Sequence, residues 1–204
     1  MQHGGKTIYC VTVGILMLET QFPRIYGDMG NAMTWDFPVQ YRVVDGATPD
    51  KVVRSKPTEL TENFIEAGRE LVRSGCDGIT TNCGFLSLIQ DEIKQALGVP
   101  VATSSLMQVP MVQTLLPAGK RCGVITISKA SLTDEHLIAA GAPVDTPIIG
   151  TEGGRNLTTS IMGDKLEIDF EACRLDMIDS GLEMVQSHPD VGTIVLEVTN
   201  MDPL

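Results

Sequence analysis

The feature that most constrains the fold of this chain is a regular alternation of short apolar runs with longer amphipathic segments. The runs are rich in Val, Ile and Thr, as buried strands are, and the segments between them have the apolar spacing of helices. Strands that alternate with helices predict parallel sheets joined by right-handed crossovers. The predicted strands are Ile8–Leu16, Tyr41–Val44, Gly78–Thr81, Val99–Thr103, Gly123–Ile127, Pro147–Ile149 and Thr193–Val198.

Five helices are predicted between these strands. Thr58 can cap the first, whose apolar stripe ends at Gly75. The others are Phe85–Leu97, a helix from Ser104 to just before Pro117, a short one from Ser131 to Gly141, and a long one from Leu166 to Ser187. The segment Gln21–Ala47 lacks a helical period, and we expect a long loop there. It would lie near the carboxyl ends of the strands, where open α/β sheets bind ligands.

Two segments of the chain echo each other. Residues 75–84 and 190–200 both follow a helix and read as a small-residue turn, an apolar strand and a polar strand end. When Gly78 is set against Thr193, Asn82 matches Glu197 and Cys83 matches Val198. The echo predicts two similar halves that direct matching strand ends at one shared cleft.

The composition argues against some classes of binding partner. The net charge of −11 argues against nucleic acids and anionic membrane surfaces. No apolar run is long enough for a transmembrane helix. The odd number of cysteines and the lack of a C-x-x-C pair predict reduced thiols and a cytoplasmic protein. The five are Cys10, Cys76, Cys83, Cys122 and Cys173.

Several common chemistries have no support in the sequence. It contains no G-x-S-x-G, Walker A or G-x-G-x-x-G motif, and its three histidines have no metal-ligand spacing. We therefore predict no metal and no cofactor.

The stretch TTNCGFL places Cys83 at the end of a strand, directly before a predicted helix. The positive end of that helix would lower the pKa of the thiol, and Gly84 would let a ligand approach the backbone. Cys83 should then be alkylated faster than Cys10, Cys122 and Cys173, which are expected to be buried. Cys76, beside the Gly75 turn, is expected to be partly exposed and is the main competitor. The alternative is that Cys83 packs as a small buried hydrophobe.

Four segments follow one another along the chain: Thr80–Leu86, Val99–Ser105, Gly123–Thr126 with Ser131-Leu132-Thr133, and Leu196–Met201. In this order they resemble the aspartate/glutamate racemase superfamily across nearly the whole chain. The stretch Phe22-Pro23-Arg24 with Gly27-Asp28-Met29-Gly30-Asn31 is similar to one subgroup of that superfamily. The resemblance implies two α/β halves related by a pseudo-twofold axis, residues 1–103 and 104–204, without the C-terminal segment that family members add. We also expect a homodimer.

The resemblance implies a cofactor-independent enzyme in which one cysteine from each half faces the substrate α-carbon. The first is Cys83, but the position of the second is Val198, which cannot carry a proton. Asn82, Thr81, Gly84, Thr199 and Asn200 are implied to bind the substrate carboxylate. Arg24 is either a site for a distal carboxylate or a surface residue.

The predicted activity is proton transfer at the α-carbon of a small amino or dicarboxylic acid, as in a racemase. Because one thiol is missing, two alternatives stay open. One is a one-thiol decarboxylase, lyase or cis–trans isomerase of the same superfamily. The other is a silent member that binds a ligand or senses oxidants through Cys83.

Overall fold

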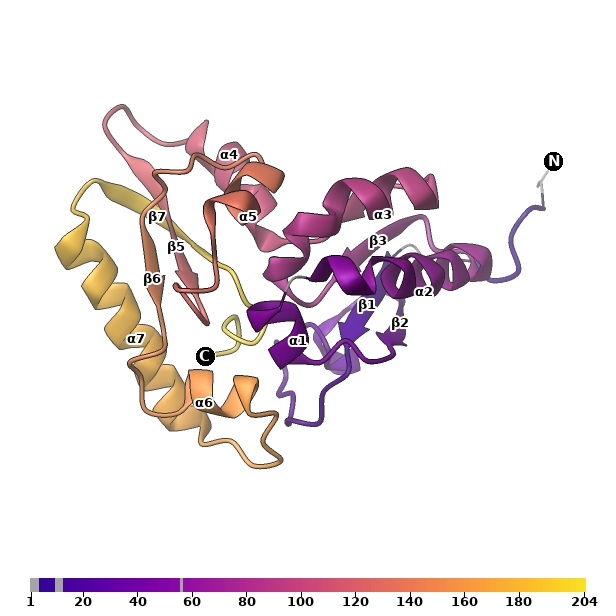
Figure 1. Cartoon of the computed structure of the whole chain (residues 1–204), viewed down its shortest axis with the longest axis horizontal. Coiled ribbons are helices and arrows are strands. Elements are labelled where there is room, and N and C mark those ends of the chain that lie inside the picture. Colours follow the sequence, from indigo (N-terminus) through magenta and orange to yellow (C-terminus); the bar gives the residue numbers. More distant parts are fainter. Residues whose placement is uncertain (1–3, 10–12, 56) are drawn as a thin grey trace.

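The computed structural model describes residues 4–9, 13–55 and 57–204. Two α/β halves lie side by side, and the C-terminal end of the chain lies between them (Figure 1). The first half contains a four-stranded sheet of order β2-β1-β3-β4, and the second a three-stranded sheet of order β6-β5-β7. All the strand pairs are parallel, which confirms the predicted fold class. The predicted boundary at residue 103 follows the last strand of the first sheet and stays a prediction.

The helices and strands of the first half are β1 (Val13–Leu18), η1 (Ala32–Thr34), β2 (Val39–Val44), α1 (Pro49–Arg54), η2 (Pro57–Leu60), α2 (Thr61–Ser74), β3 (Gly78–Thr81), η3 (Gly84–Ile89), α3 (Gln90–Leu97) and β4 (Val101–Ala102). Those of the second half are η4 (Ser105–Met107), α4 (Gln108–Gln113), β5 (Arg121–Thr126), α5 (Asp134–Ala139), β6 (Ile148–Gly150), α6 (Leu157–Met162), α7 (Phe170–Ser187) and β7 (Val191–Leu196).

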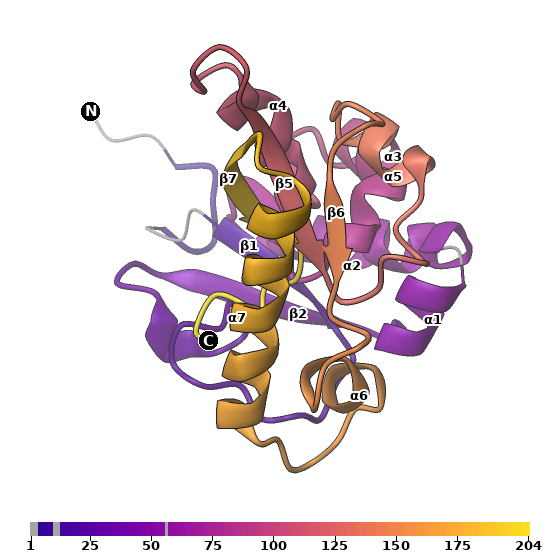
Figure 2. The ribbon, with the colours of Figure 1, turned by 90° about the vertical axis from the view of Figure 1, so that its left-hand side faces the viewer.

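The central strand of each sheet is an almost unbroken apolar run. Strand β1 reads VGILML and is buried from Gly14 to Leu18, and β5 is buried from Cys122 to Thr126. Parallel strands covered on both faces lose the alternation of polar and apolar residues that one-sided sheets show. In the second half, α7 covers one face of the sheet and crosses in front of its strands in Figure 2. None of the described helices is long and apolar enough to cross a membrane.

Helix α2 ends as predicted but starts later. Gly75 adopts the left-handed conformation (φ 116°), and its N–H bonds to the last carbonyls of the helix. Thr58 does not cap the helix, because Pro57 opens a 3₁₀ turn and α2 begins only at Thr61. The predicted helix Phe85–Leu97 is likewise divided into a 3₁₀ segment and α3.

The remaining differences lie at element ends and in short helices. Helices α1 and α6 have six residues each, too few for a repeated apolar stripe to reveal them. The loop predicted over residues 21–47 contains strand β2. The predicted strand Ile8–Leu16 includes residues 10–12, which lie outside the described part of the chain, and β1 is described from Val13.

The strand register confirms the internal echo. Thr81 pairs with Leu16 of central strand β1, as Leu196 pairs with Ile125 of central strand β5. The next residue donates its backbone N–H to that same central residue in both sheets, Asn82 to Leu16 O at 3.2 Å and Glu197 to Ile125 O at 2.8 Å. Cys83 and Val198 therefore follow equivalent strands.

Candidate functional site

One small cavity between the halves brings the two echoing strand ends together. Asn82 and Cys83 of the first half and Val198 and Asn200 of the second half line it. Most of the other lining side chains are apolar. The space open to the centre of a water-sized sphere is only about 20 Å³, enough for about one water. In this structure the site is closed around the thiol.

Cys83 sits at the turn between β3 and η3 and is 5% exposed. Its backbone N–H reaches Thr81 Oγ1 at 3.5 Å, while the Thr81 hydroxyl donates to Thr103 O at 2.7 Å. Thr81 therefore shapes the turn that presents the thiol. Its hydroxyl is engaged with backbone atoms of its own half.

The electrostatics of Cys83 differ from the sequence prediction. Burial raises the pKa of the thiol and the charge of Glu197 raises it further, while the backbone N–H of Phe85 opposes them only in part. The predicted lowering by a helix N-terminus is wrong, since six residues of 3₁₀ helix separate Cys83 from α3 at Gln90. Cys83 is a neutral thiol in the closed site.

The other cysteines are also buried. Cys122 and Cys173 are 2% and 1% exposed, as predicted. The prediction of a partly exposed Cys76 is wrong, because it is 3% exposed and packs beside Gly14 of β1. Cys10 lies outside the described residues.

Glu197 is a site residue that the sequence reasoning missed. It is fully buried, and its Oε2 accepts a hydrogen bond from Thr126 Oγ1 at 2.9 Å. Its Oε1 has no hydrogen-bond partner of good geometry among the described residues. Burial raises the pKa of Glu197 to about 8, against the Thr126 hydroxyl and the nearby backbone N–H groups of Gly84 and Ile127. The sequence contained a signal for this residue, because the internal echo aligned Glu197 with Asn82 and placed a carboxylate between apolar residues.

Gly84 is required where Glu197 packs against the thiol-bearing turn. A Cβ added at Gly84 would lie 2.2 Å from Glu197 Oε1 and 2.8 Å from the Glu197 carbonyl oxygen. Only glycine leaves room for this close approach. The sequence predicted that a ligand would approach the backbone at Gly84. In the structure the Glu197 carboxylate of the second half fills that space.

Asn82 and Thr199 hold the two strand ends in place. Asn82 Oδ1 accepts the Leu18 N–H at 2.8 Å, and Thr199 Oγ1 donates to the Asn82 carbonyl at 3.0 Å. Among the described residues, no partner binds the Asn82 Nδ2 group. That amide is therefore available to a ligand that enters the cavity.

Arg24 is placed behind the cavity wall rather than on it. Its guanidinium pairs with Asp28 Oδ1 at 2.8 Å, donates to Thr20 Oγ1 at 3.0 Å and lies 4.6 Å from the Phe22 ring centroid. Asp28 also accepts from Asn200 Nδ2. Arg24 thus fixes the loop and the end of the second half, and both terminal nitrogens of its guanidinium already donate a hydrogen bond.

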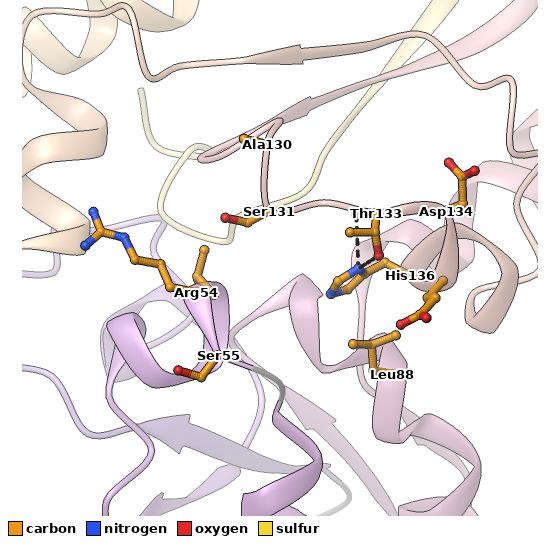
Figure 3. A pocket seen from close by; sticks show the side chains of 10 residues that line it. Arg54, Ser55, Leu88, Ala130, Ser131, Thr133, Asp134 and His136 are labelled. Carbon is orange, nitrogen blue, oxygen red and sulfur yellow. Dashed lines mark hydrogen bonds between the residues drawn. The ribbon is translucent and has the colours of Figure 1, made fainter.

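A larger pocket of about 650 Å³ lies outside the cavity. Figure 3 shows Arg54 and Ser55 on one side of it and Ser131 and Thr133 on the other. Val53 of α1 borders both this pocket and the Cys83 cavity, and Pro49 of α1 lines the cavity. Helix α1 is therefore a wall between the open pocket and the closed site.

Several polar side chains of the larger pocket already have hydrogen-bond partners. The Ser131 hydroxyl bonds to Ser128, Thr133 to the His136 ring at 3.0 Å, and Arg54 to Asp50 at 3.0 Å. No thiol lines it. Within the described part of the chain, no three His, Cys, Asp or Glu side chains gather as metal ligands. The cavity at Cys83 is therefore a better candidate for proton transfer than the larger pocket. The larger pocket is a candidate route by which a ligand could reach Cys83.

Solved structures with similar folds agree with this architecture. Unliganded arylmalonate decarboxylase matches with a TM-score of 0.54 and 15% identity over 91% of this chain and 76% of that one. An Asp/Glu racemase homologue from Yersinia pestis matches with a TM-score of 0.51 and 10% identity over 94% of this chain and 96% of that one. The chain has the Asp/Glu racemase fold. At these identities the likeness shows the fold alone.

Two curated proteins of similar sequence both carry the name of a lyase. A protein named dimethylsulfoniopropionate lyase from Durusdinium sp. clade D is 25% identical over 94% of this chain. Dimethylsulfoniopropionate lyase 7 of Emiliania huxleyi is 27% identical over 98% of this chain. The chain spans 66% and 62% of the lengths of these two relatives. No protein-family model matches the chain.

Proposed function

We propose that this chain carries the active site of a cofactor-independent lyase that splits dimethylsulfoniopropionate or a similar β-substituted carboxylate. Cys83, as thiolate, takes the proton from the substrate α-carbon. The electrons of that C–H bond form a double bond between the α- and β-carbons, and the bond from the β-carbon to sulfur breaks. The products are acrylate and neutral dimethyl sulfide.

The observation that carries this proposal is the single thiol, with Val198 instead of cysteine at the equivalent strand end. Racemisation removes a proton from one face of the α-carbon and returns one to the other face, so it needs two proton carriers. An elimination needs one base, because the reaction is completed by departure of the leaving group. The lyase relatives support the same choice.

The cavity lining suits a substrate with one carboxylate and a sulfonium group. The free Asn82 amide is a donor for the carboxylate, and the apolar walls suit the methyl groups. The positive sulfonium favours the thiolate of Cys83, since an opposite charge nearby lowers the pKa of an acid. A cation-bearing substrate would therefore help to activate its own base.

The substrate has to open the site before it reacts, since the closed cavity holds about one water. Helix α1 is the wall with the larger pocket on its outer side. We expect the substrate to enter from that pocket by displacing α1.

The reaction is tested by incubating the purified chain with dimethylsulfoniopropionate in deuterium oxide. Dimethyl sulfide is sampled from the headspace, and acrylate in the solution is followed by proton NMR. The two products should appear in equal amounts. Aspartate and glutamate are incubated in parallel and followed for exchange and change of configuration at the α-carbon. Racemisation of either acid without any cleavage of the sulfonium substrate would contradict the lyase and favour the racemase.

Val198→Cys provides a further test of the single-thiol argument. The cysteine adds a proton carrier from the second half at modest structural cost, because both side chains are small and apolar. We expect the variant to gain racemisation of a chiral carboxylic acid that the parent chain lacks. Chiral chromatography measures the gain, with Val198→Ala as the control that adds no proton carrier. A folded Val198→Cys variant that racemises nothing would mean that position 198 does not face the α-carbon.

A further inference from the structure

We infer that the two amide side chains of the cavity give it a fixed polarity, with a hydrogen-bond donor at Asn82 and an acceptor at Asn200. The carboxylate of a substrate lies at the Asn82 end, and its cationic group lies against the Asn200 carbonyl oxygen. This inference rests on the proposed lyase function and deepens it, because it names the substrate class as zwitterions without net charge. Asn200 then determines specificity, and Asp28 is the residue that positions it.

The orientation of the Asn82 amide follows from its backbone partner. Asn82 Oδ1 accepts the N–H of Leu18 at 2.8 Å, and a backbone N–H can only donate. The amide oxygen therefore has to face Leu18. Asn82 is 4% exposed and lines the cavity. Its Nδ2 group, which no described residue accepts, is left as a donor for a ligand.

The Asn200 amide is turned the other way. Its Nδ2 group donates to Asp28 Oδ2, and a carboxylate that is paired with a guanidinium can only accept. Asn200 is 9% exposed and lines the cavity, whereas Asp28 does not line it. No described residue donates to Asn200 Oδ1, and that oxygen is not fully covered by the protein. The second amide therefore offers a ligand an acceptor, which differs from the carboxylate-binding role that the resemblance implied for Asn200.

Asp28 is held firmly enough to fix this orientation. It is 2% exposed. Its Oδ1 accepts Arg24 Nη1 at 2.8 Å and the Gly30 N–H at 2.6 Å, which leaves Oδ2 for Asn200. Hydrogen bonds in a chain polarise one another, so an amide that donates to a carboxylate carries more negative charge on its carbonyl oxygen. That oxygen is thus a good partner for a cation.

The charge of the cavity wall favours the same class of substrate. None of the described residues that line the cavity is acidic or basic, and Arg24 is paired with Asp28. Burial raises the pKa of Glu197 to about 8, so this acid is mainly neutral at pH 7. A dicarboxylate would bring two uncompensated negative charges into this site, which is costly. A zwitterion compensates its own charge, and each of its ends meets an amide group of the matching polarity.

The test measures the binding of three carboxylates that resist cleavage to the purified chain, by isothermal titration calorimetry at pH 7. The first is β-alanine betaine, a zwitterion. The second is its isostere with carbon in place of the charged nitrogen, and the third is levulinate, which has a carbonyl acceptor instead of the cation. We expect the parent chain to bind the betaine at least about tenfold more tightly than the other two, the scale of a contact with a charged group.

A double variant, Asp28→Asn with Arg24→Gln, should reverse the second amide without a change in net charge. The Gly30 N–H keeps the oxygen of the new amide at position 28 on its own side, so the new N–H group faces Asn200. Asn200 then has to accept with Oδ1 and present Nδ2 to the cavity. We expect levulinate to bind more tightly than the betaine in this variant. Arg24→Gln alone keeps the Asp28 acceptor and should keep the parental order of affinities.

Asn200→Leu tests the same point if the double variant does not fold. It removes the acceptor at nearly constant size, so the betaine should lose its advantage over the uncharged isostere. Circular dichroism establishes that each variant is folded. A parent chain that does not bind the betaine, or binds both isosteres equally, would overturn the inference. A folded double variant that still prefers the betaine would overturn it as well.

Binding and turnover separate this inference from the lyase proposal. If the parent chain prefers the betaine and the double variant prefers levulinate, but no dimethyl sulfide is released from dimethylsulfoniopropionate, the polarity of the cavity stands and the lyase proposal fails. If the chain cleaves dimethylsulfoniopropionate but shows no preference between the isosteres, the lyase proposal stands and the role of Asn200 is excluded.

Discussion

Replacement of Cys83 by serine is expected to lower the turnover of dimethylsulfoniopropionate by about 10²–10⁴-fold, the usual contribution of a positioned base. A serine hydroxyl occupies nearly the same space but is far less acidic, so it cannot form the anion that removes the α-proton. The loss should appear in kcat, because the neighbouring Asn82 and Asn200 still line the cavity. Acrylate production by purified, folded protein measures it.

Cys76→Ser is the matched control. Cys76 is as buried as Cys83 but lies at the turn after α2, beside Gly14 of β1, away from the cavity. It should keep its activity even if it loses some stability. Cleavage by Cys83→Ser within about tenfold of the parent rate would exclude the thiol as the base.

Replacement of Asp176 by asparagine is expected to lower the free energy of unfolding by about 3 kcal/mol, the scale for breaking a buried charged network. Asp176 of α7 has a fully buried carboxylate. It accepts the backbone N–H groups of Arg155, Asn156 and Leu157 at 2.6, 2.8 and 2.9 Å. The asparagine amide would turn a donor toward these donors and leave at least one without a partner. Urea unfolding measures the change.

The same carboxylate predicts a pH dependence of stability. Burial raises the pKa of Asp176, but the three backbone N–H groups and the Arg155 side chain lower it more, so its net pKa lies below the ordinary value. Its stabilisation is present above the pKa of an unfolded aspartate and is lost as pH falls through the lower folded pKa. Asp176→Asn should therefore lose most of its disadvantage in acid.

Asp179→Asn is the control for this network. Asp179 also pairs with Arg155, at 2.7 Å, but its side chain is 58% exposed. An exposed ion pair contributes little, so its loss should change stability by less than about 1 kcal/mol. Equal losses in both variants would show that the Arg155 ion pairs, rather than the buried backbone bonds, hold α6 to α7.

Much of the fold could be predicted from local patterns. Each of the seven predicted strands overlaps an observed strand, the first of them only from Val13 to Leu16, because a strand buried on both faces is apolar regardless of its neighbours. Gly75 correctly marked the end of α2, since a left-handed residue is a local requirement. Helices α1 and α6 were missed because six residues carry no periodic signal, and both lie close to the site.

The candidate site could likewise be predicted only in part from local patterns. The stretch TTNCGFL and its echo identified Cys83, Asn82, Val198 and Asn200, and the structure brings these four to one cavity. Thr81, Thr199 and Arg24 do not line the cavity, and they donate to Thr103, Asn82 and Asp28. Their predicted role in binding a carboxylate stays a prediction. Their partners are distant in sequence or lie in loops, so no local pattern could assign them.

The sequence by itself determined two parallel α/β halves and the position of one thiol at the end of a strand. Both depend on local patterns of apolar spacing and turn residues. Only the tertiary structure decided the charge state of that thiol. A pKa depends on burial and on charges that come close in space, and Glu197 lies 114 residues along the chain from Cys83 yet packs against the next residue, Gly84. For that reason the thiol predicted to be activated by a helix is instead a neutral, buried one beside a buried acid.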